Sequence, residues 1–74
     1  MWTEGEIEIS GVLFEYWAKH FENGSEYGID GGRISKLNIR RDDIDVVNYD
    51  RGWDVYPEDE LDKQAYEEIL DEFN

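Results

Sequence analysis

Carboxylates are the commonest side chains through which this 74-residue chain could do chemistry. The sequence holds 20 aspartates and glutamates, seven lysines and arginines, one histidine and no cysteine. Two neighbouring carboxylates can act as general acid and base, because the charge of one raises the pKa of the other. Glu6 and Glu15 are the best-placed pair, since a tight turn at Ser10-Gly11 sets them opposite each other. A flat hairpin face has no cleft that excludes water, so we expect a solvated surface there rather than a catalytic pair.

The other candidates for chemistry also have simpler structural interpretations. His20 has no second imidazole with which to hold a transition metal, and we expect a half-buried sheet residue near Tyr27 with a weak response to pH. Asp42, Asp43 and Asp45 lack the glycine and terminal glutamate of an EF-hand loop, so turn formation is the preferred interpretation.

The glycine-rich segment 28–32 lacks the spacing and the lysine-serine pair of a phosphate-binding loop, and a strand bend is the preferred interpretation. No nucleophile-base pair, metal cluster or cofactor fingerprint remains. We therefore expect no catalytic residue, no metal, no cofactor and no enzymatic activity.

Size and charge narrow the classes of partner. Residues 1–74 are predicted to form a single domain, and the 39% of hydrophobic residues is enough for a thin core. The formal net charge of −13 repels phosphate backbones and anionic lipids, which argues against direct binding to nucleic acid or membranes. No signal peptide or membrane span is recognisable, so a cytoplasmic location is expected. Residues 33–41 are the exception, with a net charge of +4, and are expected to pair with acidic neighbours.

The turn at Ser10-Gly11 predicts a hairpin with a definite register. Pairing Ile9 with Val12 sets Ile7 opposite Phe14, and further along it sets Thr3 opposite Ala18. One face of the hairpin then collects small and apolar side chains. The other face collects Glu4, Glu6, Glu8 and Glu15.

A second turn signal, Asn23-Gly24, predicts a hairpin between strands 14–22 and 25–30. In this register His20 faces Tyr27 and Ala18 faces Ile29. The third strand is expected to bend at residues 31–32 and continue through Leu37 and Ile39. Residues 44–49 then read as a fourth strand, and residues 50–54 as a loop.

The end of the chain has the pattern of an amphipathic helix. Pro57 suits a first helical turn, and Leu61, Ala65, Ile69 and Phe73 recur every four residues. The expected outer face carries Asp62, Glu67, Glu68, Asp71 and Glu72. The predicted fold class is α+β, an antiparallel meander of about four strands followed by one C-terminal helix packed on the sheet.

The face opposite the predicted core groups Trp2, Leu13, Trp17 and Phe21. One helix cannot cover both faces of a sheet, so three arrangements stay open. The helix packs on this second face, or the loop 50–57 with Trp53 covers part of it, or the aromatic side chains meet another protein or another copy of the chain.

Two segments resemble small uncharacterised proteins of Gram-positive bacteria and their phages. They are Ser25-Glu26-Tyr27-Gly28-Ile29-Asp30-Gly31-Gly32-Arg33-Ile34-Ser35-Lys36-Leu37 and Asn48-Tyr49-Asp50-Arg51-Gly52-Trp53. The resemblance spans most of the chain and implies no particular activity.

The leading hypothesis is a non-catalytic acidic module that binds a protein partner, such as a phage or mobile-element accessory protein that occupies a basic, nucleic-acid-binding surface of a host protein. The alternative is a small structural or assembly protein that self-associates, for example as a homodimer, through its aromatic sheet face. The residues predicted to bind the partner are Trp2, Glu4, Glu6, Glu8, Glu15, Trp17, Phe21, Asp62, Glu67, Glu68, Asp71 and Glu72.

Overall fold

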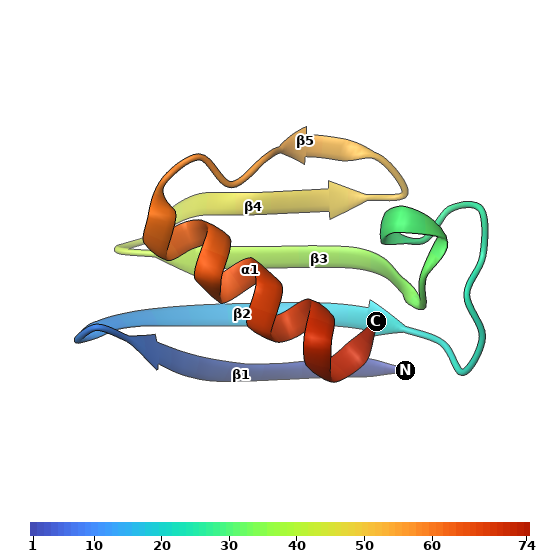
Figure 1. The fold of residues 1–74 in the computed structure, drawn as a ribbon, viewed down its shortest axis with the longest axis horizontal. Helices are drawn as coiled ribbons and strands as arrows, with labels where there is room; N and C mark the ends of the chain where they lie inside the picture. The colour runs from blue at the N-terminus through green and yellow to red at the C-terminus, as the bar shows by residue number, and fades with distance from the viewer.

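The structure, a computed structural model, describes all 74 residues as one antiparallel sheet with a helix across it. The strands hydrogen-bond in chain order, and the helix crosses one face of the sheet diagonally (Figure 1). The α+β meander with a C-terminal helix is therefore confirmed, with one additional short strand in the region predicted as a loop. The elements are β1 (Trp2–Ile9), β2 (Val12–His20), β3 (Ile34–Arg41), β4 (Ile44–Asp50), β5 (Trp53–Val55) and α1 (Glu60–Phe73), with a single 3₁₀ turn at Ile29–Gly31.

The β1–β2 hairpin has the register that its turn predicts. Ile9 pairs with Val12, Ile7 with Phe14 and Thr3 with Ala18. Ser10 and Gly11 both have positive φ, 52° and 80°, as a type I′ turn requires. Phe14 and Ala18 consequently lie in the core, and the glutamates of β1 point to the other face.

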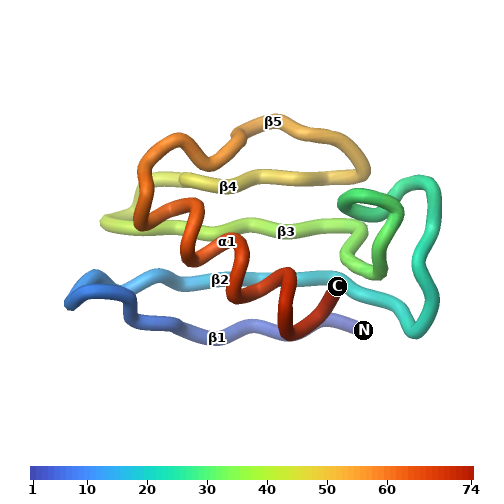
Figure 2. The backbone as a smooth tube through the Cα atoms, viewed as in Figure 1, coloured from blue at the N-terminus to red at the C-terminus, as the bar shows by residue number.

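The second predicted hairpin is wrong. Residues 25–30 form no strand; β3 begins at Ile34, and Leu37 rather than Ile29 pairs with Ala18. The segment after Asn23-Gly24 instead closes into a loop, in which the Ser25 N–H donates to the Gly32 carbonyl at 3.2 Å. This loop lies beyond the ends of β2 and β3 (Figure 2). Its closure buries Ile29, which a hairpin would have placed in a strand.

Helix α1 packs on the Phe14 face of the sheet, which answers the question that the sequence leaves open. Ala65 and Ile69 are buried against a core that includes Phe14, Leu37 and Val47. The helix begins at Glu60, so Pro57 precedes the first turn instead of lying in it, and its ring is buried. At 14 residues and with its many charges, α1 does not meet the requirements of a membrane-spanning helix.

Candidate protein-binding face

The helix leaves one complete face of the sheet uncovered. We call this surface the open face, and the strand register arranges its side chains in rows that run across the strands. One row runs from Trp2 through Lys19 and Lys36 to Asp50. The open face consists of Trp2, Glu4, Glu6, Glu8, Leu13, Glu15, Trp17, Lys19, Phe21, Lys36, Asn38, Arg40, Asp45, Asn48 and Asp50.

Large apolar side chains on the open face are in contact with solvent. Trp2 is 59% exposed, Leu13 51% and Phe21 47%, whereas Trp17 is half-buried in the middle of the sheet. A shallow hollow of about 340 Å³ lies between the two tryptophans and the polar residues of β3 and β4. The sequence therefore places these four side chains on the correct face, and no element of the chain covers them.

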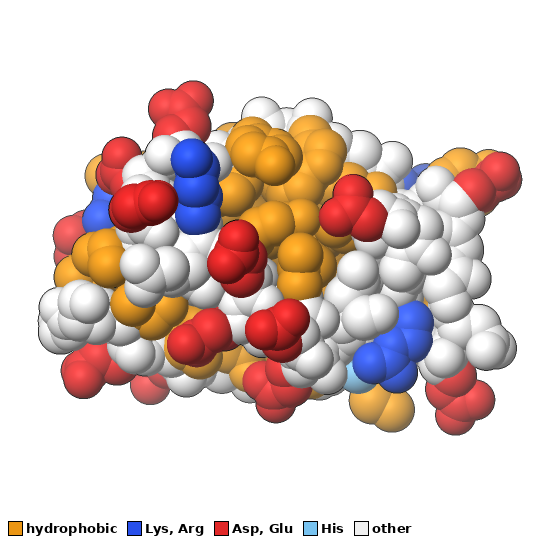
Figure 3. All heavy atoms as spheres, in the orientation of Figure 1, with side chains coloured by type: hydrophobic (Ala, Val, Ile, Leu, Met, Phe, Trp, Pro, Cys, Tyr) orange, Lys and Arg blue, Asp and Glu red, His pale blue; other side chains and the backbone are white.

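Trp53 does not cover the open face, contrary to one of the predicted arrangements. Its ring packs on the helix side, with centroids 5.1 Å from Tyr49 and 5.4 Å from Tyr66. Figure 3 shows the apolar surface that gathers there, over β4 and β5 beside the helix. The error arises because residues 53–55 pair with β4 as a fifth strand, which fixes the side of the sheet on which Trp53 lies.

The charges of the open face divide into two halves. On β3 and β4 the bases are neutralised, with Arg40 Nε 3.1 Å from Asp45 Oδ1 and Lys36 Nζ 3.7 Å from Asp50 Oδ1. The expected pairing of the basic stretch with acidic residues is thus confirmed for Lys36, Arg40 and Arg41, whereas Arg33 forms no ion pair. On β1 and β2, in contrast, four exposed glutamates take part in no ion pair of the chain: Glu4, Glu6, Glu8 and Glu15.

Sequence reasoning missed the contribution of β3 and β4 to this face. Lys36, Asn38 and Arg40 alternate with the buried Leu37 and Ile39. That alternation was the signal that could have found them. The contribution of this segment is missed because the predicted third strand pairs residues 25–30, instead of residues 34–41, with β2.

Most of the predicted helix residues lie on the opposite side of the molecule. The outer surface of α1 carries acidic side chains, visible in Figure 3, and faces away from the sheet. Exposed residues there include Glu67, Glu68, Asp71 and Glu72. The two predicted acidic surfaces are therefore separate, and a single flat partner surface cannot contact both.

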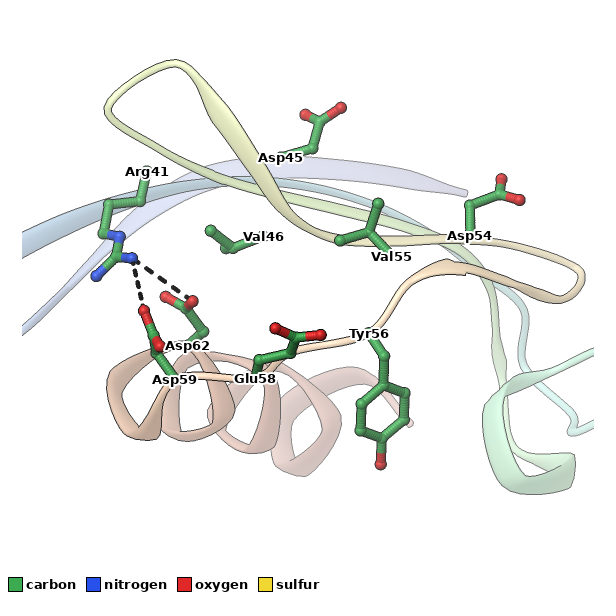
Figure 4. Close-up of a pocket in the computed structure, with 9 residues that line it drawn as sticks. All are labelled: Arg41, Asp45, Val46, Asp54, Val55, Tyr56, Glu58, Asp59 and Asp62. Atoms are coloured by element: carbon green, nitrogen blue, oxygen red, sulfur yellow. Dashed lines mark hydrogen bonds and ion pairs between the residues drawn. The ribbon is translucent and has the colours of Figure 1, made fainter.

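Asp62 is the exception, because it points inward instead of outward. It is only 4% exposed, and its Oδ2 lies 3.6 Å from Arg41 Nη2, which also approaches Asp59 Oδ2 at 3.1 Å (Figure 4). Position 62 precedes Ala65 and Tyr66 by three and four residues and so belongs to the buried stripe of the helix. Burial raises the pKa of Asp62 above its usual value, and the Arg41 charge opposes that rise only in part.

The pKa values of His20 and Tyr66 are also shifted. His20 contacts Thr3 Oγ1 through Nε2 at 2.9 Å and stacks near Phe73, so the expected Tyr27 contact is wrong. Burial lowers the pKa of His20, assisted by the N-terminal ammonium and Arg33. Burial among other acidic groups raises the pKa of Tyr66 to about 12.

The aspartates after β3 form a turn, as their types predict. Asp42 and Asp43 have φ of 54° and 62°, and Asp45 belongs to β4 and pairs with Arg40. No three histidine, aspartate or glutamate side chains converge as ligands of a metal ion. The feature that stands out is therefore an uncovered sheet face with aromatic and unpaired acidic side chains.

Comparison with known proteins gives a family but no activity. No curated protein and no solved structure is significantly similar to this chain. The family that does match has the description "domain of unknown function (DUF7678)", and the match extends over residues 1–74. The chain that presents this uncovered aromatic and acidic sheet face belongs, over its whole length, to the DUF7678 family.

Proposed function

We propose that this protein is a non-catalytic module that binds a basic surface of another protein through its open face. The observation that supports this most is the exposure of Trp2, Leu13 and Phe21 on a sheet face that no element covers. Exposed apolar patches of this kind commonly mark interfaces, and tryptophan is enriched among the residues that dominate binding energy.

The charges on the open face favour a cationic partner. Lys36 and Arg40 are already paired within the chain, whereas the glutamates of β1 and β2 are not. Burying an unpaired carboxylate in an interface is costly unless the partner supplies a cation. Lysine or arginine side chains would supply it, and an arginine can also stack on Trp2 or Trp17.

A nucleic-acid-binding surface is the kind of basic surface that this arrangement suits. Glu4, Glu6 and Glu8 repeat at every second residue of one strand, which spaces them by roughly 6.7 Å. A regular row of negative charge is what a phosphate-binding surface attracts. We propose further that the protein acts in the cytoplasm of Gram-positive bacteria, as an accessory protein of a phage or mobile element that occupies such a surface on a host protein.

The test is affinity capture from a bacterial lysate with matched charge variants. One triple variant carries Glu4→Gln, Glu6→Gln and Glu15→Gln on the open face; its control carries Glu67→Gln, Glu68→Gln and Asp71→Asn on the helix. Both change the net charge by three at exposed positions, where substitutions alter stability little. We expect the wild type and the helix variant to retain a basic protein that elutes with salt, and the open-face variant to lose it.

Two outcomes would contradict the proposal. If both triple variants lose the captured protein equally, its retention depends on overall charge and not on the open face. If no basic protein is retained at low salt, the proposed class of partner is wrong. A captured protein whose binding to DNA persists in the presence of the chain would refute the nucleic-acid part alone.

Self-association through the open face is the second candidate, and the exposed Trp2, Leu13 and Phe21 are the observation in its favour. Two copies face to face would bury apolar area, but each would bring four unpaired glutamates and only one unpaired cation, Lys19, so most of the carboxylates would be buried without a partner. The two candidates predict opposite responses to salt.

A further inference from the structure

Strand β1 is an open edge of the sheet. It pairs with β2 on one side only, and Figure 1 shows no element beyond it on the other. It is eight residues long, and its register with β2 runs without a bulge. Edge strands are usually protected by charged side chains, proline, a bulge or a covering loop, since their free backbone groups pair readily with other strands. Strand β1 has no proline, no bulge and no covering loop, and its protection consists of the negative charges of Glu4, Glu6 and Glu8.

The hydrogen-bond alternation tells which backbone groups of β1 are free. Met1 and His20 exchange both of their bonds, at 2.9 and 3.1 Å. In an antiparallel ladder every second residue pair exchanges two hydrogen bonds in this way. The odd-numbered residues of β1 therefore direct their N–H and C=O groups towards β2. The N–H and C=O groups that point away from the sheet are therefore those of Trp2, Glu4, Glu6 and Glu8.

The same four residues place their side chains on the open face. A strand added at this edge would therefore align its residues directly beside three unpaired glutamates and a tryptophan. Its alternate residues would lie on the helix side, beside the half-buried Ile7 and near the C-terminal end of α1, which crosses β1 (Figure 1). The edge thus fits an extended segment in which basic and apolar residues alternate.

A second copy of β1 does not fit this description. Antiparallel pairing of two β1 strands about Glu6 would set Glu4 of each copy opposite Glu8 of the other, and the two Glu6 side chains opposite each other. Like charges directly opposite destabilise a strand pair. The glutamates consequently disfavour self-pairing and favour a basic strand.

We infer that the protein binds its partner by strand addition, with an extended segment that carries lysine or arginine at alternate positions docking antiparallel to β1. This inference rests on the proposed function and specifies how the partner is recognised. The backbone groups of β1 supply the affinity, and Glu4, Glu6 and Glu8 select the basic residues.

The test uses the full chain and a capped peptide of alternating lysine and valine, seven residues long with lysine at both ends. Two forms of the peptide each carry one N-methyl group, on the third lysine or on the central valine. In antiparallel addition the lysine amides bond to β1 and the valine amides point away. We expect methylation at lysine to weaken binding about tenfold and methylation at valine to have little effect.

A second arm changes the protein. Glu6→Pro removes the carboxylate and a backbone N–H that points to solvent, which an edge strand tolerates, and Glu6→Gln is its control for the lost charge. We expect the proline variant to bind the unmodified peptide more weakly than the glutamine variant. On binding, the amides of Glu4 and Glu8 should gain protection from hydrogen exchange.

Equal binding of the two methylated peptides, together with equal binding by the Glu6→Pro and Glu6→Gln variants, would overturn strand addition. The proposed function would survive that result if the open-face charge variant still lost its basic partner. Loss of selectivity in the capture experiment would instead remove the proposed function itself.

Discussion

Asp62 carries an almost fully buried carboxylate, and its surroundings make stability depend on pH. The 3.6 Å separation from Arg41 is too long for a hydrogen bond, and Oδ1 has no hydrogen-bond partner. Burial therefore dominates and raises the pKa of the carboxyl. The folded chain holds this proton more tightly than the unfolded chain, so the stabilising contribution is present below the unfolded pKa of 3.8 and is lost as pH rises through the folded pKa.

We accordingly expect Asp62→Asn to be more stable than the wild type at pH 7, with the difference shrinking towards zero near pH 3. Urea unfolding followed by circular dichroism across this range measures it. Glu68→Gln makes the same charge change at an exposed position and should show no such pH-dependent gain. A less stable Asp62→Asn at pH 7 would mean that the Arg41 ion pair outweighs burial.

A side chain that follows α1 helps to hold the loop between β2 and β3, together with Tyr49, whose hydroxyl donates to the Tyr27 carbonyl at 2.8 Å. Asn74 accepts a hydrogen bond from the Ile34 N–H at 2.9 Å and donates one to the Ile29 carbonyl at 3.1 Å. We expect Asn74→Ala to lower the free energy of unfolding by roughly 1–3 kcal/mol, because the Ile34 N–H loses its partner and the Ile29 carbonyl keeps only the Gly32 N–H, at 2.8 Å. Asn74→Asp keeps the acceptor and loses the donor, so its loss should be smaller. Urea unfolding measures both, and an Ile34 amide whose hydrogen exchange does not accelerate in Asn74→Ala would contradict this role.

At the scale of elements, the sequence predicts what short-range patterns control. The register of β1 and β2 follows from two turn residues, and α1 follows from an apolar recurrence within one segment. The hairpin predicted for residues 14–30 is wrong, because the loop found there depends on contacts between residues that are far apart in the sequence. Ile29 is buried under a loop that Asn74 fastens from 45 residues away. The burial of Asp62 is different, because its spacing to Ala65 and Tyr66 within α1 already places it on the buried side of the helix; only its contact with Arg41 involves another element.

For the whole molecule, the candidate site was predictable only in part. The alternation of residues along β1 and β2 is enough to place Trp2, Trp17 and four glutamates on one face. That this face is left uncovered depends on the side to which α1 packs, and its charge balance depends on how Lys36 and Arg40 pair. The packing side of the helix and the ion pairs are both tertiary properties. Because of them, the open face has an acidic half on β1 and β2 and a neutralised half on β3 and β4.

The net charge of −13 should keep copies of the chain apart when little salt is present. At 0.01 M salt the screening length is about 30 Å, so the repulsion between two chains acts over their full width, whereas at 1 M it is about 3 Å. We expect sedimentation velocity to show a monomer at both concentrations, while binding to a basic partner weakens over the same range. Self-association through Trp2, Leu13 and Phe21 would respond in the opposite sense, because salt removes the repulsion and leaves apolar burial in place. A dimer fraction that increases with salt and is lost in Trp2→Ser would therefore assign the open face to self-association. A monomer that releases its basic partner as salt increases would assign the open face to binding of another protein.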